Sequence, residues 1–295
     1  MNSPRLSGVI AAIPTPVTAD GQPDIQRFVA LARRLLDDGC DALNVCGTTG
    51  EATSMSVAQR VMVMSAAAAS LPRERLMVGT GAAAVADAVA LTRLAAELGF
   101  AGALLLPPFY YKGVSAEGVV AYVGAVARAT ADRPIPLYLY HFPALSGVPY
   151  APELVAELRR RVPGRIAGLK DSSGDLAYAR TVAGIAKDLS VFPSSEATLL
   201  EARSGTFAGC ISATATLNSA FCAKAWRAGD TAAQATAAAI RKVVSEGPLI
   251  PRIKSVCADM MADPAYATVL PPMTALPHDE AAKLAAEVRR LAAAT

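Results

Sequence analysis

A lysine at the end of a short apolar stretch is the residue in this sequence best placed to do chemistry. Residues 165–169 (RIAGL) lead into Lys170, and the turn-forming stretch DSSGD follows at residues 171–175. An apolar run of this length, bounded by turn residues, is typical of a buried parallel strand. Lys170 would then lie at the rim of a core, where the free amine of a partly desolvated lysine can act as a nucleophile. The alternative is a side chain that reaches solvent or pairs with Asp171 or Asp175.

Hydroxyl groups and backbone N–H groups gather in a second stretch, GTTGE at residues 47–51. It follows an apolar run and precedes a helical pattern. Gly47, Thr48 and Thr49 would therefore present N–H and hydroxyl groups at the start of a helix, a position suited to a carboxylate. Simple capping of that helix by one of the threonines is the alternative. We interpret Glu51 as structural, because its charge would repel a carboxylate substrate.

Tyrosines follow two further apolar runs. Tyr110 and Tyr111 come after residues 102–108 (GALLLPP), and Tyr140 ends the run at residues 135–140 (IPLYLY). A tyrosine at a strand end can transfer protons, or it can simply fill space. Taken together, an amine, a phenol and a carboxylate-binding loop supply the groups needed for Schiff-base chemistry on a 2-oxo acid.

Composition argues against several other classes of protein. The two histidines, His141 and His278, are too few for a multi-histidine metal centre, and no Gly-x-Ser-x-Gly stretch is present. The five cysteines form no CxxC pair, so we expect neither a zinc site nor a disulfide framework. The formal net charge of +3 comes without a basic stripe, and we expect no nucleic-acid partner.

Hydropathy and cysteine usage also bear on location. No apolar run reaches the roughly 18 residues of a membrane span, and Pro14 and Pro16 interrupt the apolar run near the start of the sequence. We therefore expect no membrane segment and no secretory signal peptide. Unpaired, scattered cysteines favour a reducing compartment, and we expect a cytoplasmic protein.

Short apolar runs alternate with helical patterns over about 220 residues. We expect strands at residues 8–16, 42–47, 76–81, 102–108, 135–140, 165–170, 189–193 and 209–214. The helical patterns between them are at residues 25–38, 57–70, 85–98, 116–131, 151–161, 176–187 and 196–204. Eight strand–helix units predict an α/β fold, a closed (β/α)8 TIM barrel, in which the groups at the carboxyl ends of the strands share one face. A doubly wound sheet is the alternative, but its Gly-x-Gly-x-x-Gly loop and the P-loop are both missing.

Strand patterns disappear after residue 216. Helical patterns follow at residues 219–226, 231–247, 250–261 and 279–294, with a loop at residues 263–277. We therefore divide the chain into a catalytic barrel at residues 1–225 and a small C-terminal helical domain at residues 226–295, packed against the barrel.

Three motifs together resemble a known family. GTTGE at residues 47–51, Tyr140-x-x-Pro143 and GLKDSSG at residues 168–174 are similar to the dihydrodipicolinate synthase / N-acetylneuraminate lyase family of class I pyruvate-dependent aldolases, and GCIS at residues 209–212 fits its eighth strand. The motifs occur in order, from about residue 10 to the C-terminal helices. The resemblance implies catalysis without metal or organic cofactor, with pyruvate or another 2-oxo acid plus an aldehyde as substrates, in a homotetramer built as a dimer of dimers.

The resemblance also implies roles for single residues. Lys170 forms the Schiff base, and Tyr140 moves protons near the imine and the aldol oxygen. Thr49 binds the substrate carboxylate, and Thr48 joins a hydroxyl relay. Tyr110 matches the tyrosine that reaches across a dimer interface to complete the relay of the neighbouring subunit. The backbone of Ile211 lines the pocket beside the imine.

Departures from the family pattern bear on the substrate. Leu145 stands where dihydrodipicolinate synthases usually carry an arginine for the carboxylate of the aldehyde, which argues against an acidic aldehyde held in that way. PALSG at residues 143–147 instead resembles the sialic-acid lyase branch, whose Asp-Glu pair after strand seven holds the sugar hydroxyls. Here Glu196 and Ala197 follow Ser195, so one acceptor is kept and the other is missing. We expect Leu145, Ser195 and Glu196 to bind the substrate. We expect that substrate to have a hydroxylated or neutral tail, such as that of a 2-keto-3-deoxy sugar acid.

Some alternatives stay open at this point. His141 stands where both branches usually have asparagine, and it could hydrogen-bond to groups behind the site or contact the substrate. The same imine could drive dehydration or deamination of a sugar acid, and 4-hydroxy-tetrahydrodipicolinate synthesis is a further candidate activity. A non-catalytic 2-oxo-acid sensor that kept the pocket is the alternative outside the enzymes.

Overall fold

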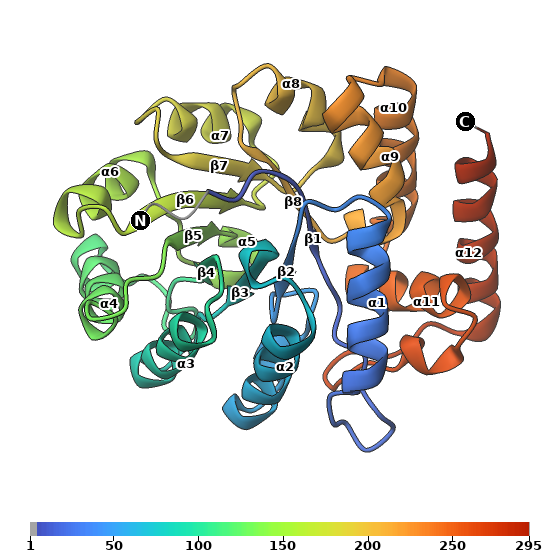
Figure 1. Cartoon of the computed structure of the whole chain (residues 1–295), viewed down its shortest axis with the longest axis horizontal. Coiled ribbons are helices and arrows are strands. Elements are labelled where there is room, and N and C mark those ends of the chain that lie inside the picture. Colours follow the sequence, from blue (N-terminus) through green and yellow to red (C-terminus); the bar gives the residue numbers. More distant parts are fainter. Residues whose placement is uncertain (1–4, 295) are drawn as a thin grey trace.

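Eight short parallel strands form a ring at the centre of the chain (Figure 1). In this computed structural model, which describes residues 5–294, they are β1 (Gly8–Ala12), β2 (Ala42–Val45), β3 (Leu76–Gly79), β4 (Gly102–Leu105), β5 (Leu137–His141), β6 (Ile166–Asp171), β7 (Ser190–Pro193) and β8 (Gly209–Ser212). The strands pair in sequence order from β1 to β7, and β8 pairs with β1. The backbone N–H of Ala208 donates to the carbonyl of Val191 at 2.9 Å and links β7 to the start of β8. The predicted (β/α)8 barrel is confirmed.

A helix follows each strand and packs on the outside of the ring (Figure 1). These helices are α1 (Ile25–Asp37), α2 (Val57–Ser70), α3 (Val85–Leu98), α4 (Ala116–Ala129), α6 (Pro152–Arg161), α7 (Leu176–Ala183), α8 (Leu199–Arg203) and α9 (Ala215–Ala228). A single turn, α5 (Pro143–Ser146), lies between β5 and α6, and short 3₁₀ helices lie at Ala52–Ser54, Arg73–Arg75, Glu196–Thr198 and Pro264–Ala267.

The starts of several helices are fixed by side chains that the sequence places just before them. Asp24 accepts a hydrogen bond from the N–H of Arg27 at the start of α1. Ser56 and Gln59 form a reciprocal capping box at the start of α2. Such caps satisfy N–H groups that have no partner within the helix. They account for the agreement between the predicted and observed starts of α1 and α2.

Prolines make some strands shorter than the apolar runs that contain them. β1 ends at Ala12 although the run continues to Pro16, and β5 begins at Leu137, directly after Pro136. Proline has no N–H to donate to a neighbouring strand. The predicted limits at residues 16 and 135 are therefore wrong by a few residues, while the strands themselves are present.

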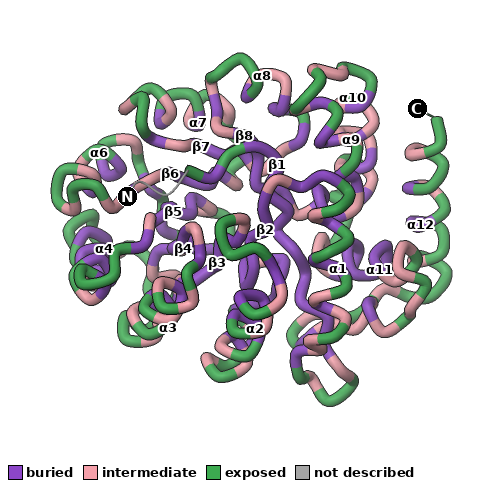
Figure 2. Tube along the Cα trace, viewed as in Figure 1, coloured by how far each residue is buried: buried purple, intermediate pink, exposed green. Residues whose placement is uncertain are grey.

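Alternate residues of each strand point to opposite sides of the ring. In β1, Val9 and Ala11 pack toward the helices, whereas Ile10 points into the barrel. The barrel interior is closed by a small cluster of buried side chains: Leu6, Ile10, Ala12, Ala42, Met77, Leu104, Tyr138, Tyr140, Phe192 and Ile211. A larger apolar layer lies between the strands and the helices. Figure 2 shows the buried strands at the centre and exposed faces on the outer helices.

Three helices follow the barrel, namely α10 (Thr231–Val244), α11 (Leu249–Met260) and α12 (His278–Ala293). They lie beside α9 and α1, with α12 at the edge of the molecule (Figure 1). The helix predicted at residues 219–226 begins earlier, at Ala215, and the non-helical backbone of Asn218 separates its first turn from the rest. The division predicted at residue 225 therefore lies inside α9. The two-domain description itself stays a prediction.

From the sequence we expect neither a signal peptide nor a membrane segment. Residues 1–4, part of the stretch in which we expect no signal peptide, lie outside the described residues. Within residues 5–294, no helix combines the length and the apolar character that crossing a bilayer requires.

Candidate active site

Lys170 and Tyr140 project side by side into the barrel. They are register partners on the neighbouring strands β6 and β5, and their neighbours Leu169 and Leu139 pack on the outer side. Lys170 is only 3% exposed, and its Nζ lies 4.4 Å from the centre of the Tyr140 ring. The face of an aromatic ring attracts an ammonium group, so this contact fixes the position of the Lys170 side chain. The amine of Lys170 therefore lies at the end of the barrel interior that the carboxyl ends of the strands form.

Asp171 does not share this position. It follows Lys170 on β6 and so points to the other side of the strand, where its Oδ1 accepts a hydrogen bond from the N–H of Ser173 at 2.9 Å. Burial raises the pKa of this carboxyl group above its usual value. The alternative in which Lys170 extends into solvent is excluded by its burial.

The hydroxyl of Tyr140 is the centre of a group of hydroxyls. Thr48 Oγ1 lies 3.3 Å from it, and Ser172 Oγ lies 3.5 Å from it. Ser172 in turn hydrogen-bonds to Ser194 across 2.6 Å. Side chains from the ends of β2, β5 and β6 therefore meet at one phenol, and Ser194 after β7 extends the group through Ser172. Such a chain of hydroxyls can transfer a proton to and from a group bound at Lys170.

Ser172 and Ser194 were not among the predicted site residues. Both follow a strand end directly, Ser172 within the stretch DSSGD and Ser194 after Pro193. Their position in a barrel was the available signal, because any polar residue just after a strand faces the same end. Their contact with Tyr140 depends on the twist and register of the strands, which the sequence pattern does not specify.

The loop after β2 brings Thr48 to Tyr140. Two of its residues, Cys46 and Glu51, adopt left-handed backbone conformations with φ of 51° and 57°, which are uncommon for residues other than glycine. Thr49 is 5% exposed. A small hollow beside the loop is lined by residues that include Gly47, Thr48, Leu106 and Tyr140. Strained backbone held by its surroundings is a common feature of functional loops.

Glu51 fastens this loop to the C-terminal part of the chain. Its carboxylate is fully buried and forms an ion pair with Lys254 of α11, which is 1% exposed. Glu51 Oε2 also accepts the N–H of Leu270 at 2.6 Å, and Lys254 Nζ donates to the carbonyl of Thr268 at 2.7 Å. Burial lowers the pKa of Lys254, and the charge of Glu51 acts in the opposite direction. This arrangement agrees with the interpretation of Glu51 as structural.

Tyr110 lies apart from this group within the chain. Tyr110 and its neighbour Tyr111 are 74% and 73% exposed, with their rings in edge-to-face contact at 5.3 Å. Leu145, on the α5 turn, is 59% exposed. Lys112 joins the two segments by donating to the carbonyl of Ser146 at 2.9 Å. The predicted role of Tyr110 across an interface stays a prediction.

Glu196 is turned to the outer side of β8. Its carboxylate is fully buried, accepts a hydrogen bond from Ser212 Oγ at 2.7 Å and pairs with Arg241 of α10 at 3.4 Å. Ile211, the neighbour of Ser212, points into the barrel, so Ser212 faces away from Lys170. A substrate contact by Glu196 would require the carboxylate to leave these partners. Ser195, predicted beside it, is half-buried, and its carbonyl accepts the Thr198 hydroxyl at 2.7 Å.

His141 is also on the outer side, one residue beyond Tyr140. Its Nδ1 accepts the N–H of Tyr150 at 3.0 Å, and its ring stacks on Tyr178 with centroids 4.1 Å apart. Burial lowers the pKa of His141 to about 4. Of the two alternatives left open above, the geometry favours the one in which His141 supports groups behind the site.

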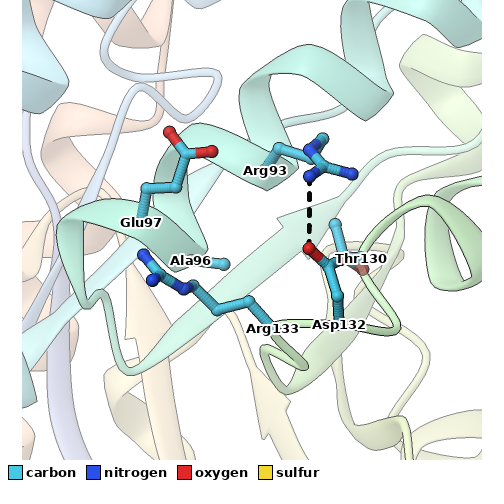
Figure 3. A pocket seen from close by; sticks show the side chains of 6 residues that line it. All are labelled: Arg93, Ala96, Glu97, Thr130, Asp132 and Arg133. Carbon is cyan, nitrogen blue, oxygen red and sulfur yellow. Dashed lines mark hydrogen bonds and ion pairs between the residues drawn. The ribbon is translucent and has the colours of Figure 1, made fainter.

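Figure 3 shows another hollow in the surface of the protein. It is lined by Arg93, Ala96, Glu97, Thr130, Asp132 and Arg133, from the end of α3 and the segment after α4. Arg93 Nη2 donates to Asp132 Oδ2 at 3.3 Å, so charges of both signs face one another there. Helices of this barrel end where strands begin, which puts this hollow on the face away from Lys170.

A family model described as the dihydrodipicolinate synthetase family matches residues 5–291. A curated protein from Chloroflexus aurantiacus, described as an uncharacterized DapA-like lyase, is 35% identical over 100% of this chain and 99% of its own length. A 4-hydroxy-tetrahydrodipicolinate synthase from Thermus thermophilus is 36% identical over 70% of this chain and 69% of its own length.

A solved structure of a protein from this family has the same fold as this chain. A prophage protein of the dihydrodipicolinic acid synthase family from E. coli K12, determined in complex with pyruvate, superposes with a TM-score of 0.87 and 27% identity. The match covers 97% of this chain and 99% of the other.

Proposed function

This chain belongs to the dihydrodipicolinate synthetase family of pyruvate-dependent lyases, and from that premise we propose that it cleaves a hydroxylated 2-oxo acid into pyruvate and an aldehyde through a Schiff base on Lys170. One observation carries the proposal. A buried amine lies against the ring of Tyr140, whose hydroxyl is within reach of Thr48 and Ser172.

The first step joins enzyme and substrate. The free amine of Lys170 attacks the C2 carbonyl carbon, water leaves, and a protonated imine forms. The substrate carboxylate is held by the N–H and hydroxyl groups of the loop at residues 47–49, with Thr49 contributing most directly. The backbone at Ile211 borders the imine. The positive nitrogen then serves as the electron sink for the next step.

The second step breaks the bond between C3 and C4. Tyr140 accepts the proton of the C4 hydroxyl as the aldehyde forms, while its own phenolic proton passes on through the hydroxyls of Thr48 and Ser172. The electron pair of the broken bond moves into the imine to give an enamine. Protonation at C3 restores the imine, and water releases pyruvate and the free amine. Thr48 and Ser172, which contact the Tyr140 hydroxyl, support its proton transfers. The reverse sequence condenses pyruvate with an aldehyde.

The environment of the site favours a hydroxylated or neutral substrate tail. Leu145 supplies no positive charge for a second carboxylate, whereas Ser172 and Ser194 offer hydroxyls close to Tyr140. Serine hydroxyls can both donate hydrogen bonds to and accept them from the hydroxyls of a sugar-derived chain, whereas Leu145 supplies none of the donors with which an arginine would hold a second carboxylate. We therefore infer a 2-keto-3-deoxy sugar acid as the substrate class.

We further propose a homotetramer in which Tyr110 completes the site of a neighbouring subunit. Two adjacent tyrosines that are about three-quarters exposed support an interface at this loop, because aromatic residues are enriched in the centres of protein interfaces.

A screen of pyruvate release across 2-keto-3-deoxy acids tests the proposed function. Activity on at least one sugar-derived acid, and none with a Lys170→Ala variant, is the expected result. Product analysis distinguishes the related activities, because loss of water or ammonia leaves the carbon chain intact whereas cleavage yields pyruvate. Turnover of aspartate semialdehyde with pyruvate, and of no sugar acid, would contradict the substrate class.

A further inference from the structure

Asn44 points into the barrel next to the carboxylate-binding loop. On β2, Leu43 and Val45 pack toward the helices and Ala42 toward the interior. Asn44 lies between Leu43 and Val45, so its side chain faces inward, and it is 0% exposed. Lys170 on β6 points into the same space, and alternate strands of such a barrel contribute side chains to shared layers.

The amide of Asn44 has no protein partner among the residues that the structure describes. Neither its Nδ2 nor its Oδ1 is hydrogen-bonded, although both atoms are fully buried. A buried polar group without a partner destabilises the folded protein, because it has lost its hydrogen bonds to water. An apolar residue at this position would avoid that penalty, as Ala42 and Met77 do in the same interior. The amide is therefore better explained by a ligand than by the stability of the fold.

The position of the amide indicates which ligand group it would meet. A side-chain carbon added to Gly47 would come within 2.7 Å of Asn44 Nδ2. The amide thus lies directly against the backbone of the first residue of the loop at residues 47–49. The register neighbours of Asn44 on the adjacent strands are Ala12 and Met77, and neither side chain offers the amide a hydrogen-bonding group. An amide N–H beside a carboxylate-binding loop is a suitable donor to a carboxylate oxygen.

We propose that Asn44 donates a hydrogen bond to the carboxylate of the 2-oxo acid bound at Lys170. The proposal rests on the proposed function. It adds a residue of the barrel interior to the carboxylate site, which the loop at residues 47–49 otherwise forms. It also makes Asn44 a substrate-binding residue that selects 2-oxo acids over ketones or esters without the free carboxylate.

Two variants of almost equal shape test the proposal. Asn44→Val removes the hydrogen-bonding groups, and Asn44→Thr has the same outline but keeps a hydroxyl donor. The assay is borohydride trapping of the Lys170 adduct over a range of pyruvate concentrations, followed by mass spectrometry. We expect Asn44→Val to raise the half-saturating pyruvate concentration about tenfold and Asn44→Thr to recover part of that loss. Thermal unfolding is expected to show Asn44→Val at least as stable as wild type.

Methyl pyruvate distinguishes a contact to the carboxylate from a general change of the pocket. The wild-type protein should prefer pyruvate over its methyl ester, and Asn44→Val should reduce that preference about tenfold. Tyr150→Phe is the matched control, since the Tyr150 hydroxyl is another buried group without a hydrogen-bond partner, placed between strands and helices. It should change neither the half-saturating pyruvate concentration nor the preference.

The outcomes separate the two proposals. Normal pyruvate saturation and an unchanged preference over the ester in Asn44→Val would overturn the role of Asn44 while leaving the Schiff base intact. An equal loss in the Val and Thr variants would also overturn it, because packing and not hydrogen bonding would then be responsible. If the wild-type protein forms no adduct at all, the proposed function fails, and the Asn44 proposal fails with it.

Discussion

His141 and its neighbour Tyr140 lie on opposite sides of β5. The inner side carries a residue proposed to act in catalysis, and the outer side carries one that holds the surrounding structure in place. Tyr140 faces the barrel interior and Lys170, whereas His141 accepts a hydrogen bond from the Tyr150 N–H and stacks on Tyr178. Burial keeps the imidazole neutral at physiological pH by lowering its pKa to about 4. In the unfolded chain the pKa of histidine is about 6.5. The unfolded chain therefore binds the proton more tightly.

This difference predicts a pH dependence of stability. The neutral imidazole makes its full contribution to the free energy of unfolding above about pH 6.5. This contribution is lost as the pH falls toward 4. We expect the loss to be about 2 kcal/mol, since each pKa unit corresponds to about 1.4 kcal/mol and some solvent access reduces the effect. Denaturant unfolding of wild type and His141→Asn at several pH values measures it, with the difference in their free energies of unfolding shrinking as the pH falls. A constant difference would contradict the account.

At the scale of elements, the loop after β2 depends on a helix more than 200 positions later in the chain. The buried pair of Glu51 and Lys254, with the contacts to Leu270 and Thr268, joins the loop to α11 and the segment after it. Removing one member of a buried ion pair leaves an uncompensated charge, whereas removing both does not. The C-terminal helices thus help to position Thr48 and Thr49.

Lys254→Met is therefore expected to destabilise the protein by about 3 to 5 kcal/mol and to weaken pyruvate binding. The double variant Lys254→Met with Glu51→Gln should regain much of the stability. Glu287→Gln, which breaks the exposed pair with Arg290 on α12, where the two side chains are 37% and 64% exposed, is the control and should change stability by less than about 1 kcal/mol. Equal effects of Lys254→Met and the control in denaturant unfolding would contradict this role.

The elements themselves were largely predictable from the sequence. Helical patterns placed α2 correctly, and apolar runs located all eight strands. The positions of Lys170 and Tyr140 at strand ends followed from the same pattern. The partners of Glu51 and Glu196 did not, because Lys254 and Arg241 come from helices whose docking depends on tertiary packing. Asn44 was missed because one polar residue in an apolar run gives no signal until the direction of its side chain is known.

At the scale of the whole molecule, the proposed assembly has a direct consequence. If Tyr110 acts in the site of a neighbouring subunit, a Tyr110→Phe variant alone should be weakly active and a Lys170→Ala variant alone should be inactive. Dissociating them, mixing them in equal amounts and allowing reassembly should form hybrid dimers with one intact site, restoring about a quarter of the wild-type activity. Unchanged low activity in reassembled mixtures, with hybrids demonstrated by native mass spectrometry, would mean that Tyr110 does not serve a neighbour.

The covalent bond between Lys170 and a 2-oxo acid is the central claim. Borohydride reduction of the protein in the presence of pyruvate, followed by peptide mass spectrometry, tests it most directly. One stable pyruvate-derived adduct, located on Lys170 and missing in Lys170→Ala, is the expected result. An unmodified Lys170 at saturating pyruvate, or an adduct on a different lysine, would contradict it.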